Sequence, residues 1–260
     1  MTSSAAQLLA EARIRHVRLA GLPESVCPKN STGAYDCQRG LVSNLLAHYG
    51  GEAIGYKIAC TNATAQRQLS VDGPFSGSLL SAFCSESPAR LEASQFFMRV
   101  VEAEFGFRMA QDLPPAAAAR SREEIAAAVE GVIPAIEIVD SRFDDWLAIG
   151  APSLIADNAC NAAWVRGPLV KDWGRLDLAA QPVRLFVNGK LAREGSGAAV
   201  LGHPLNALAW LANNLSTRGI GLKAGQYITT GVTTEVYMAE AGDRALADFG
   251  AAGTAEVEFY

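Results

Sequence analysis

Long hydrophobic runs are missing from this sequence, since no apolar stretch in its 260 residues is long enough to cross a membrane. The N-terminal segment, MTSSAAQLLAEARIRH, contains Glu11 and lacks the basic region followed by an apolar core that is typical of a signal peptide. We expect an amphipathic helix there, with Leu8 and Leu9 on its buried side. The pattern therefore indicates neither a membrane-spanning nor an exported protein.

Paired cysteines are missing as well. The five cysteines are widely spaced and none form a Cys-x-x-Cys pair, so we expect neither a disulfide framework nor a zinc site. Unpaired cysteines are typical of a reducing compartment, and the sequence therefore predicts a cytoplasmic protein. The five are Cys27, Cys37, Cys60, Cys84 and Cys160.

Positive charge is not in excess. The chain has 22 Lys and Arg against 27 Asp and Glu, a net charge of −5, whereas a nucleic-acid-binding protein usually has a basic face. We therefore expect no nucleic-acid partner. Charged residues make up 19% of the chain and hydrophobic residues 50%, which excludes a largely disordered protein. This composition can form a sizeable core in one large domain or two lobes.

The apolar pattern predicts helices in the first fifty residues. AYDCQRGLVSNLLAHYGG (34–51) has apolar residues at helical spacing and a double glycine at its end. AIGYKIACT (53–61) alternates as a strand does and contains Lys57. Residues 62–90 are expected to form a loop around the turn-rich segment VDGPFSG.

Beyond this predicted loop the pattern is mainly β. QFFMRVVEAEFGFRMA (95–110) and VIPAIEIVDS (132–141) are expected to be buried strands. Between them, SREEIAAAVEGV predicts a helix that Ser121 caps, that Glu124 supports through a capping box, and that Gly131 ends.

The last third of the chain continues this mixture. PVRLFVNGKLARE (182–194) predicts a hairpin with its turn at Asn188-Gly189. GHPLNALAWLANNLSTRG predicts a helix with Pro204 near its start and with His203 as a capping or packing residue. GQYITTGVTTEVYMA and GTAEVEFY are expected to close the chain as strands. Runs of strands with few helices indicate an α+β fold rather than a doubly wound α/β fold.

Two acids interrupt the longest predicted strand. Side chains at i and i+2 point to the same face of a strand, so Glu102 and Glu104 of VVEAEF should project side by side. A third acid, Glu137, lies between Ile136 and Ile138 in a strand that is too apolar to be an ordinary surface strand. Buried carboxylates that converge repel one another, unless a hard divalent cation such as Mg²⁺ or Mn²⁺ binds their oxygens. The alternative is a solvated strand face, and spacing alone leaves open whether the three acids meet.

Other polar residues have a structural interpretation beside a functional one. Lys57 lies between apolar neighbours and is either an acid or base with a lowered pKa in a cleft, or a strand lysine whose ammonium reaches solvent. Cys160 has no histidine near it in the sequence and is interpreted as structural. Asp140, Asp144 and Asp145 are interpreted as loop acids.

Six segments, taken together, carry a family resemblance: GYKIACTNATAQRQLSVDGPFSGSL, VVEAEFGFRMAQDLP, VIPAIEIVDSRFDDW, IADNA, VLGHPLNALAWLANNL and GQYITTG. In this order they resemble the 2-oxopent-4-enoate hydratase and 4-oxalocrotonate decarboxylase group of the fumarylacetoacetate hydrolase superfamily. The likeness covers roughly residues 30–260. The Glu-x-Glu strand, the later glutamate and GHPLNA are specific only in combination.

The resemblance implies both a fold and a site. The fold is a mixed β roll at 91–260, preceded by a smaller, largely helical part at 1–90 that includes the Lys57 strand. The three glutamates should bind Mg²⁺ or Mn²⁺, and Lys57 matches the active-site lysine of the group. Thr230 and Gly231 of ITTG match a segment near the substrate carboxylate.

The resemblance also implies two related reactions on small acids that carry a 1-carboxylate and a 2-keto or 2-enol oxygen. A hydratase of this group ketonises a 2-hydroxy-2,4-dienoate and adds water at C4, in aromatic or steroid ring catabolism. A decarboxylase removes the distal carboxylate of a 2-oxo-3-enedioate. Both reactions pass through the same type of enolate, so one scaffold can host either.

Two departures from the group affect this choice. Phe75 stands where many relatives have an acid, and Cys160 stands where many have a serine. We interpret both as substrate-binding positions, together with Arg142, which could equally pair with Asp144 or Asp145. A second substrate carboxylate would need a cationic subsite, and only Arg142 and Arg67 are candidates for it. The sequence therefore favours hydration over decarboxylation, with C–C bond hydrolysis third because no His–Glu arrangement is found.

A different class of function is a non-catalytic partner subunit, in which the two departures would mark a drifted site. The presence of all three glutamates and of Lys57 argues against it. In either case we expect a homo-oligomer, with association with a pathway aldolase or decarboxylase as a further expectation.

Overall fold

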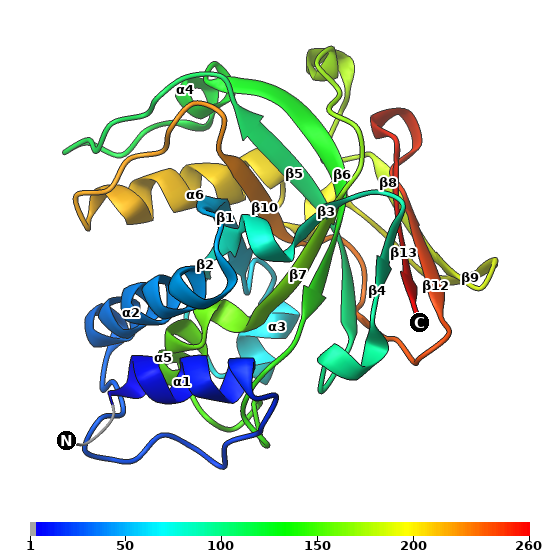
Figure 1. Cartoon of the computed structure of the whole chain (residues 1–260). Coiled ribbons are helices and arrows are strands. Elements are labelled where there is room, and N and C mark those ends of the chain that lie inside the picture. The colour runs from blue at the N-terminus through cyan, green and yellow to red at the C-terminus, as the bar shows by residue number, and fades with distance from the viewer. Residues whose placement is uncertain (1–3) are drawn as a thin grey trace.

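The structure of the protein is a computed structural model that describes residues 4–260 (Figure 1). It contains two β-sheets with helices packed around them, which confirms the predicted α+β class and the roll with a helical N-terminal part. The described helices are α1 (Ala5–Ile14), α2 (Ser31–Tyr49), α3 (Ala63–Gln68), α4 (Arg122–Ala126), α5 (Ala151–Ala156) and α6 (Pro204–Ser216). None of these helices has the length and apolar character needed to cross a bilayer.

The larger sheet has eight strands in the order β2-β1-β10-β5-β6-β7-β3, with β11 paired to β5. Its two long central strands, β5 and β6, pair in antiparallel, whereas β1 pairs with β10 in parallel. The strands are β1 (Ala53–Ala59), β2 (Phe75–Leu80), β3 (Cys84–Glu86), β5 (Val100–Met109), β6 (Val129–Val139), β7 (Asn161–Arg166), β10 (Tyr227–Val232) and β11 (Tyr237–Met238).

The smaller sheet has five strands in the order β4-β13-β12-β8-β9. Its strands are β4 (Ala89–Leu91), β8 (Pro182–Val187), β9 (Lys190–Ser196), β12 (Arg244–Asp248) and β13 (Thr254–Phe259). The predicted hairpin is confirmed as β8 and β9, with Asn188 and Gly189 both at positive φ in the turn.

The main core lies against one face of β5. Val101, Ala103 and Phe105 point into it and share a buried cluster with Val183 and Leu185 of β8. The even-numbered residues of β5, among them Glu102 and Glu104, therefore lie on the opposite face, and their side chains point away from the smaller sheet. That face meets the helices α2 and α5, which lie on the other side of the larger sheet (Figure 1).

Two stretches of the chain form other elements than the sequence predicts. Residues 62–90 are not a loop, because they contain α3, β2, β3 and the start of β4. The alternation of β2 is hidden in the sequence since the strand is buried on both faces and includes Ser76 and Gly77. The helix at 121 does begin with the predicted capping box, but it ends at Ala126, and Gly131 lies inside β6. A Cβ at Gly131 would press on Leu169 and Val170, so this glycine serves a close approach of chains rather than a helix end.

Other local predictions are confirmed. Pro204 is the first residue of α6, and the Nδ1 atom of His203 accepts a hydrogen bond from the Leu205 amide at 3.0 Å, as a cap does. Leu9 of α1 is fully buried. The division of the chain near residue 90 stays a prediction; β1 and β2 share the larger sheet with strands of the second part.

Candidate active site

Three carboxylates converge on the face of β5 and β6 that looks toward the helices. Glu102 pairs with Glu137 across the two strands, and Glu104 lies two residues further along β5 on the same face. One oxygen from each acid lies within 4.8 Å of the others. Glu104 and Glu137 are fully buried, while Glu102 is partly exposed. The predicted convergence is therefore confirmed, and a solvated strand face is excluded.

Each of the two buried carboxylates has one oxygen with partners and one without. Glu104 Oε2 accepts hydrogen bonds from the Thr229 hydroxyl at 2.5 Å and the Gly231 amide at 2.8 Å. Glu137 Oε1 accepts from Asn161 Nδ2 at 2.8 Å and pairs with Lys57 Nζ at 3.1 Å. Within residues 4–260, Glu104 Oε1 and Glu137 Oε2 are buried without a hydrogen-bond partner.

This donor set fits a hard divalent cation. Leaving a buried charged oxygen without a partner costs more than the 1–3 kcal/mol or so of a neutral group, and three acids face one lysine here. A divalent cation would supply the missing charge and bind the two unpartnered oxygens. The carboxyl oxygens are the ligand type that Mg²⁺ prefers, and Glu102 is the partly exposed member of the three.

The carboxyl groups are perturbed in the absence of a cation. Burial raises the pKa of Glu104 well above 4.5, and the charges of Glu137 and Glu102 raise it further. Burial and the charge of Glu137 also raise the pKa of Glu102. A carboxyl with a higher pKa in the folded state binds more protons when folded, so the metal-free protein should lose stability as pH rises above about 4.5.

Metal binding should therefore release protons. We expect the affinity for Mg²⁺ to rise with pH from about 4.5 upward, by about tenfold per pH unit for each proton released. Calorimetric titration with Mg²⁺ in two buffers of different ionisation enthalpy measures the number of protons directly. An affinity that does not change with pH would contradict the raised pKa values.

Lys57 lies inside the same cluster. It is 2% exposed, and its ammonium donates to the Ala159 carbonyl at 3.0 Å as well as pairing with Glu137. Burial works to lower its pKa, but the carboxylates of Glu137, Glu102 and Glu104 outweigh burial and raise it. The interpretation as a solvent-reaching lysine is wrong. A lowered pKa of Lys57 beside a bound cation stays a prediction. Lys57 is an ammonium that can donate hydrogen bonds and a proton.

A left-handed turn positions two contacts of the site, the one between Ala159 and Lys57 and the one between Asn161 and Glu137. Asn158, Ala159 and Cys160 have φ values of 53°, 53° and 59°, a strained conformation for residues other than glycine. The side-chain amide of Asn158 accepts a hydrogen bond from the Ser78 backbone N–H and donates one to the Ser78 carbonyl, both in β2. The turn aims the Ala159 carbonyl at Lys57 and begins β7 at Asn161, whose side chain bonds Glu137. Strain at this point is typical of a functional site.

The substrate-binding candidates are placed as follows. Phe75 and Cys160 belong to one buried apolar cluster with Val100 and Val139. These two valines are each two residues from a glutamate on the same strand face, so the cluster adjoins the carboxylates directly. Burial raises the pKa of Cys160 to about 12, so its thiol is inert, which is consistent with a structural role.

The ITTG segment contributes differently at its two positions. The Gly231 amide holds Glu104, as described above. The Thr230 hydroxyl donates to the Phe105 carbonyl at 2.8 Å and is therefore engaged within the sheet. A role of either residue in substrate binding stays a prediction.

The two arginine candidates lie outside this cluster. Arg142 is 2% exposed and donates through Nε to Asp157 at 2.7 Å, so the suggested pairing with Asp144 or Asp145 is wrong. Arg67 is exposed on α3 and donates to Thr64.

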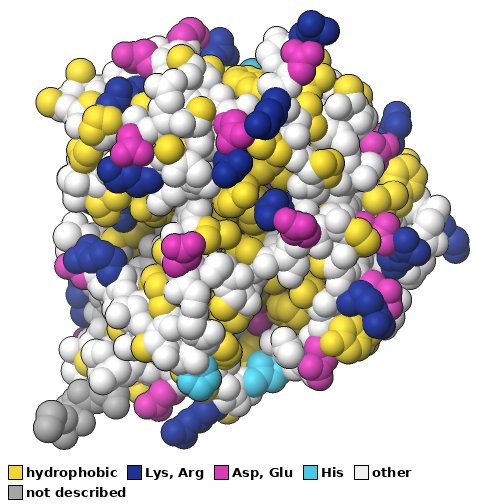
Figure 2. Space-filling view, turned by 45° about the horizontal axis from the view of Figure 1, so that its top comes forward, with side chains coloured by type: hydrophobic (Ala, Val, Ile, Leu, Met, Phe, Trp, Pro, Cys, Tyr) yellow, Lys and Arg dark blue, Asp and Glu magenta, His cyan; other side chains and the backbone are white. Residues whose placement is uncertain are grey.

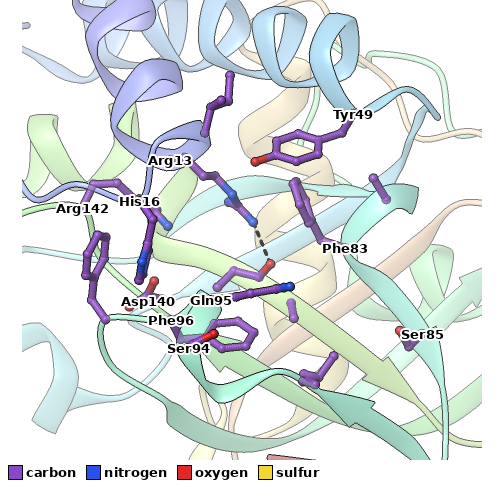
Figure 3. Close-up of a pocket in the computed structure, with 16 residues that line it drawn as sticks. Arg13, His16, Tyr49, Phe83, Ser85, Ser94, Gln95, Phe96, Asp140 and Arg142 are labelled. Carbon is purple, nitrogen blue, oxygen red and sulfur yellow. Dashed lines mark hydrogen bonds between the residues drawn. The ribbon is translucent and has the colours of Figure 1, made fainter. Parts of the chain in front are cut away.

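Arg142 also lines a cavity of about 400 Å³ (Figure 3). None of the three glutamates is among its lining residues. Arg13 of α1 projects into this cavity and donates to the carbonyls of Asn161 and Ala162, each at 2.7 Å. Figure 2 shows one face of the molecule, on which acidic and basic side chains are interspersed around a recess where hydrophobic side chains gather.

Three supporting residues were missed by the sequence interpretation: Thr229, Asn158 and Asn161. The signal for Asn158 and Asn161 was the group of polar residues in IADNACNAAW, whereas Thr229 belongs to the ITTG segment. Their roles depend on pairing with β2, β5 and β6, which the sequence does not display.

The fold defines an enzyme of the fumarylacetoacetate hydrolase type, and its three carboxylates form a cluster that could hold a metal ion. The family model described as Fumarylacetoacetate (FAA) hydrolase C-terminal matches residues 81–259. The chain belongs to this family.

Curated relatives include both activities of the group. The chain is 38% identical to 2-hydroxyhexa-2,4-dienoate hydratase of Comamonas testosteroni, over 81% of this chain and 79% of the relative. It is 32% identical to 2-keto-4-pentenoate hydratase of Paraburkholderia xenovorans, over 98% and 93%. It is 30% identical to 4-oxalocrotonate decarboxylase of Pseudomonas putida, over 81% and 78%.

Solved structures agree with the fold. The 4-oxalocrotonate decarboxylase of Pseudomonas putida G7, complexed with magnesium and adipate, has a TM-score of 0.90 and 27% identity, with 98% of this chain and 95% of that chain covered. Fumarylpyruvate hydrolase of Pseudomonas aeruginosa, in complex with Mn²⁺ and pyruvate, has a TM-score of 0.61 at 18% identity, over 81% and 90%, which supports the fold alone.

Proposed function

We propose that this protein is a divalent-metal-dependent hydratase that adds water to 2-hydroxy-2,4-dienoates of the 2-oxopent-4-enoate type and forms 4-hydroxy-2-oxo acids. The observation that carries the proposal is the cluster of three carboxylates with two unpartnered buried oxygens beside the Lys57 ammonium. Relatives named as hydratases match most of the chain at 32–38% identity. The alternative of a non-catalytic subunit would not require so complete a cluster.

Glu102, Glu104 and Glu137 would hold Mg²⁺ or Mn²⁺. When bound, such a cation polarises the C2 oxygen of a 2-oxo acid and stabilises the negative charge that develops there. Glu104 is oriented by Thr229 and Gly231, and Glu137 by Asn161, so the ligand oxygens are held before substrate arrives.

Lys57 is the proton donor of the site. Hydration of a dienoate requires proton transfer to carbon when the dienol is ketonised, and again after water adds at C4. An ammonium held by Ala159 and Glu137 in a buried cluster is oriented for one of these transfers. Its two acceptors, the Glu137 carboxylate and the Ala159 carbonyl, favour the ammonium form and therefore the acid role.

The choice of hydration over decarboxylation rests on what is absent around the cluster. A second substrate carboxylate would need a cationic partner, but Arg142 is neutralised by Asp157 and Arg67 is exposed on α3. Besides the polar residues that contact the carboxylates directly, the neighbouring cluster of side chains is apolar and includes Phe75 and Cys160. This environment suits a hydrocarbon tail. The high structural similarity to a decarboxylase keeps that reaction as the second candidate.

Product analysis separates the two reactions. Purified protein with Mg²⁺ is offered 2-hydroxypenta-2,4-dienoate and, separately, 2-oxohex-3-enedioate. We expect loss of the dienoate absorbance with formation of 4-hydroxy-2-oxopentanoate, and little carbon dioxide from the dicarboxylate. Carbon dioxide released stoichiometrically, and faster than the dienoate is hydrated, would assign decarboxylation instead.

The setting of the enzyme belongs to the same proposal. All five cysteines are free in the described structure, which suits the reducing cytoplasm that the sequence predicts. A homo-oligomer, and association with an aldolase or decarboxylase of the same pathway of aromatic or steroid ring catabolism, remain expectations.

A further inference from the structure

One buried hydroxyl next to Gly231, the residue whose amide bonds Glu104, has no hydrogen-bond partner within residues 4–260. Thr61 lies two residues beyond the end of β1 and is 1% exposed. Its carbonyl accepts a hydrogen bond from the Leu201 amide at 2.9 Å, so its backbone is fixed. Its Oγ1 atom, however, is buried and has no hydrogen-bond partner within residues 4–260. Only Glu104 and Glu137 have such oxygens besides Thr61 in this part of the chain.

The position of this hydroxyl is set by Gly231. Gly231 has a φ of +100°, and a Cβ at this position would collide with Thr61 Oγ1. The absence of a side chain therefore leaves a slot that the threonine hydroxyl occupies. The amide of the same glycine holds Glu104. Thr61 Oγ1 thus lies next to the backbone group that orients a metal-binding carboxylate.

The other hydroxyls of this region are already engaged. Thr229 donates to Glu104, Thr230 to the Phe105 carbonyl, and Thr233 to the Ala103 carbonyl at 2.7 Å. The Lys57 ammonium is shared between Glu137 and Ala159. Thr61 is therefore the hydroxyl that the described protein leaves free to bind something else, and a buried hydroxyl without a partner is costly.

We propose that the Thr61 hydroxyl binds the C1 carboxylate of the substrate, a role that rests on the proposed function because it assumes a 2-oxo acid at this site. A divalent cation held by the three glutamates would attract the C2 oxygen and one carboxylate oxygen of such an acid. The second carboxylate oxygen then needs a donor from the protein. A threonine O–H supplies a donor without adding charge, and Thr61 selects for acids whose carboxylate adjoins the oxygen at C2.

Oxalate is the probe for this proposal, because it has a carboxylate next to a second carbon–oxygen group and is not turned over. Binding of oxalate to the Mg²⁺-loaded protein is measured by calorimetry for the wild type, Thr61→Val and Thr61→Ser. A hydrogen bond to a charged group is lost in the valine variant, so we expect oxalate to bind roughly 10- to 100-fold more weakly. Thr61→Ser should restore most of the affinity.

Three further readouts separate this role from a structural one. The KM for the dienoate should rise in Thr61→Val by a factor similar to the loss of oxalate affinity, with kcat little changed. The melting temperature of the ligand-free variant should be unchanged or higher, because the hydroxyl that is removed has no partner. The affinity for Mg²⁺ should match the wild type, whereas Thr229→Val, which removes a hydrogen bond to Glu104, should weaken it.

Several results would overturn the role of Thr61. They are wild-type affinity for oxalate in Thr61→Val, a parallel loss of Mg²⁺ affinity, or a wild-type protein that binds no oxalate when loaded with Mg²⁺. Because oxalate binding needs no turnover, the test is independent of the reaction. A protein that binds oxalate through Thr61 but hydrates no dienoate would refute the proposed function alone.

Discussion

Replacing Glu104 by glutamine should nearly abolish turnover while leaving the fold intact. The glutamine carbonyl can still accept from Thr229 and Gly231, the two donors that now bond Glu104 Oε2. Its amide group then replaces Oε1, the buried oxygen without a partner. A neutral donor there cannot bind a cation. We expect affinity for Mg²⁺ and turnover to fall by more than about 100-fold, the upper end of the loss when only an outer-shell partner of a metal ligand is changed.

The thermal stability of Glu104→Gln is a second, independent test of the metal site. Burial and like charge raise the pKa of Glu104, so the ionised acid destabilises the metal-free protein at neutral pH. Glu104→Gln should therefore melt at the same or a higher temperature than the metal-free wild type, and Mg²⁺ should no longer stabilise it.

Glu130→Gln on β6 is the matched control for Glu104→Gln. It makes the same chemical change at a residue that pairs with Arg108 and Lys171 instead. Near-normal turnover and metal affinity in Glu104→Gln, or an equal loss in the control, would contradict the assignment of the metal site.

The sequence predicts that two of the carboxylates share one strand face, because side chains alternate between the two faces of a strand. The spacing of Glu102 and Glu104 fixes that they share a face, and the apolar neighbours of Glu137 indicate that this acid is buried. The register that pairs Glu102 with Glu137 cannot be predicted from the sequence of either strand alone. The family resemblance supplied the convergence, and the geometry of the sheet confirms it.

The misplaced elements share a physical cause. β2 has small residues and is buried on both faces, so it shows no alternation and resembles a loop. Gly131 matches a helix stop, yet it lies in β6 where Leu169 and Val170 approach closely. Local patterns report the backbone preferences of a segment, and they do not report which other segment will pack against it.

The same limit applies to the polar contacts of the site. Arg142 could have paired with either of two aspartates close in sequence, but the fold brings Asp157 to it instead. Asn158, Asn161 and Thr229 hold the site through partners on other strands. Thr61 differs from these residues, because its hydroxyl has no hydrogen-bond partner within residues 4–260. It is identified by checking every buried polar atom for a partner, which requires the folded structure.

Replacing Lys57 by methionine should lower kcat by about 10²- to 10⁴-fold, the usual contribution of a positioned proton donor. Methionine has a similar length and no charge, and it can fill the buried space of a side chain that is 2% exposed. The change removes the ammonium from Glu137 and from the Ala159 carbonyl. It also removes the positive charge nearest the carboxylates, so the affinity for Mg²⁺ should stay the same or increase.

Metal-dependent stability distinguishes lost catalysis from lost folding in this variant. Without a cation, Glu137 keeps only Asn161 as a partner, and breaking a buried ion pair costs about 3–5 kcal/mol, so metal-free Lys57→Met should be clearly destabilised. With saturating Mg²⁺, the cation compensates Glu137 and much of that stability should return. Turnover is then measured on a folded, metal-loaded protein. A kcat close to that of the wild type under these conditions would exclude Lys57 from the proton transfers, whereas a large loss of kcat with intact metal binding assigns it to them.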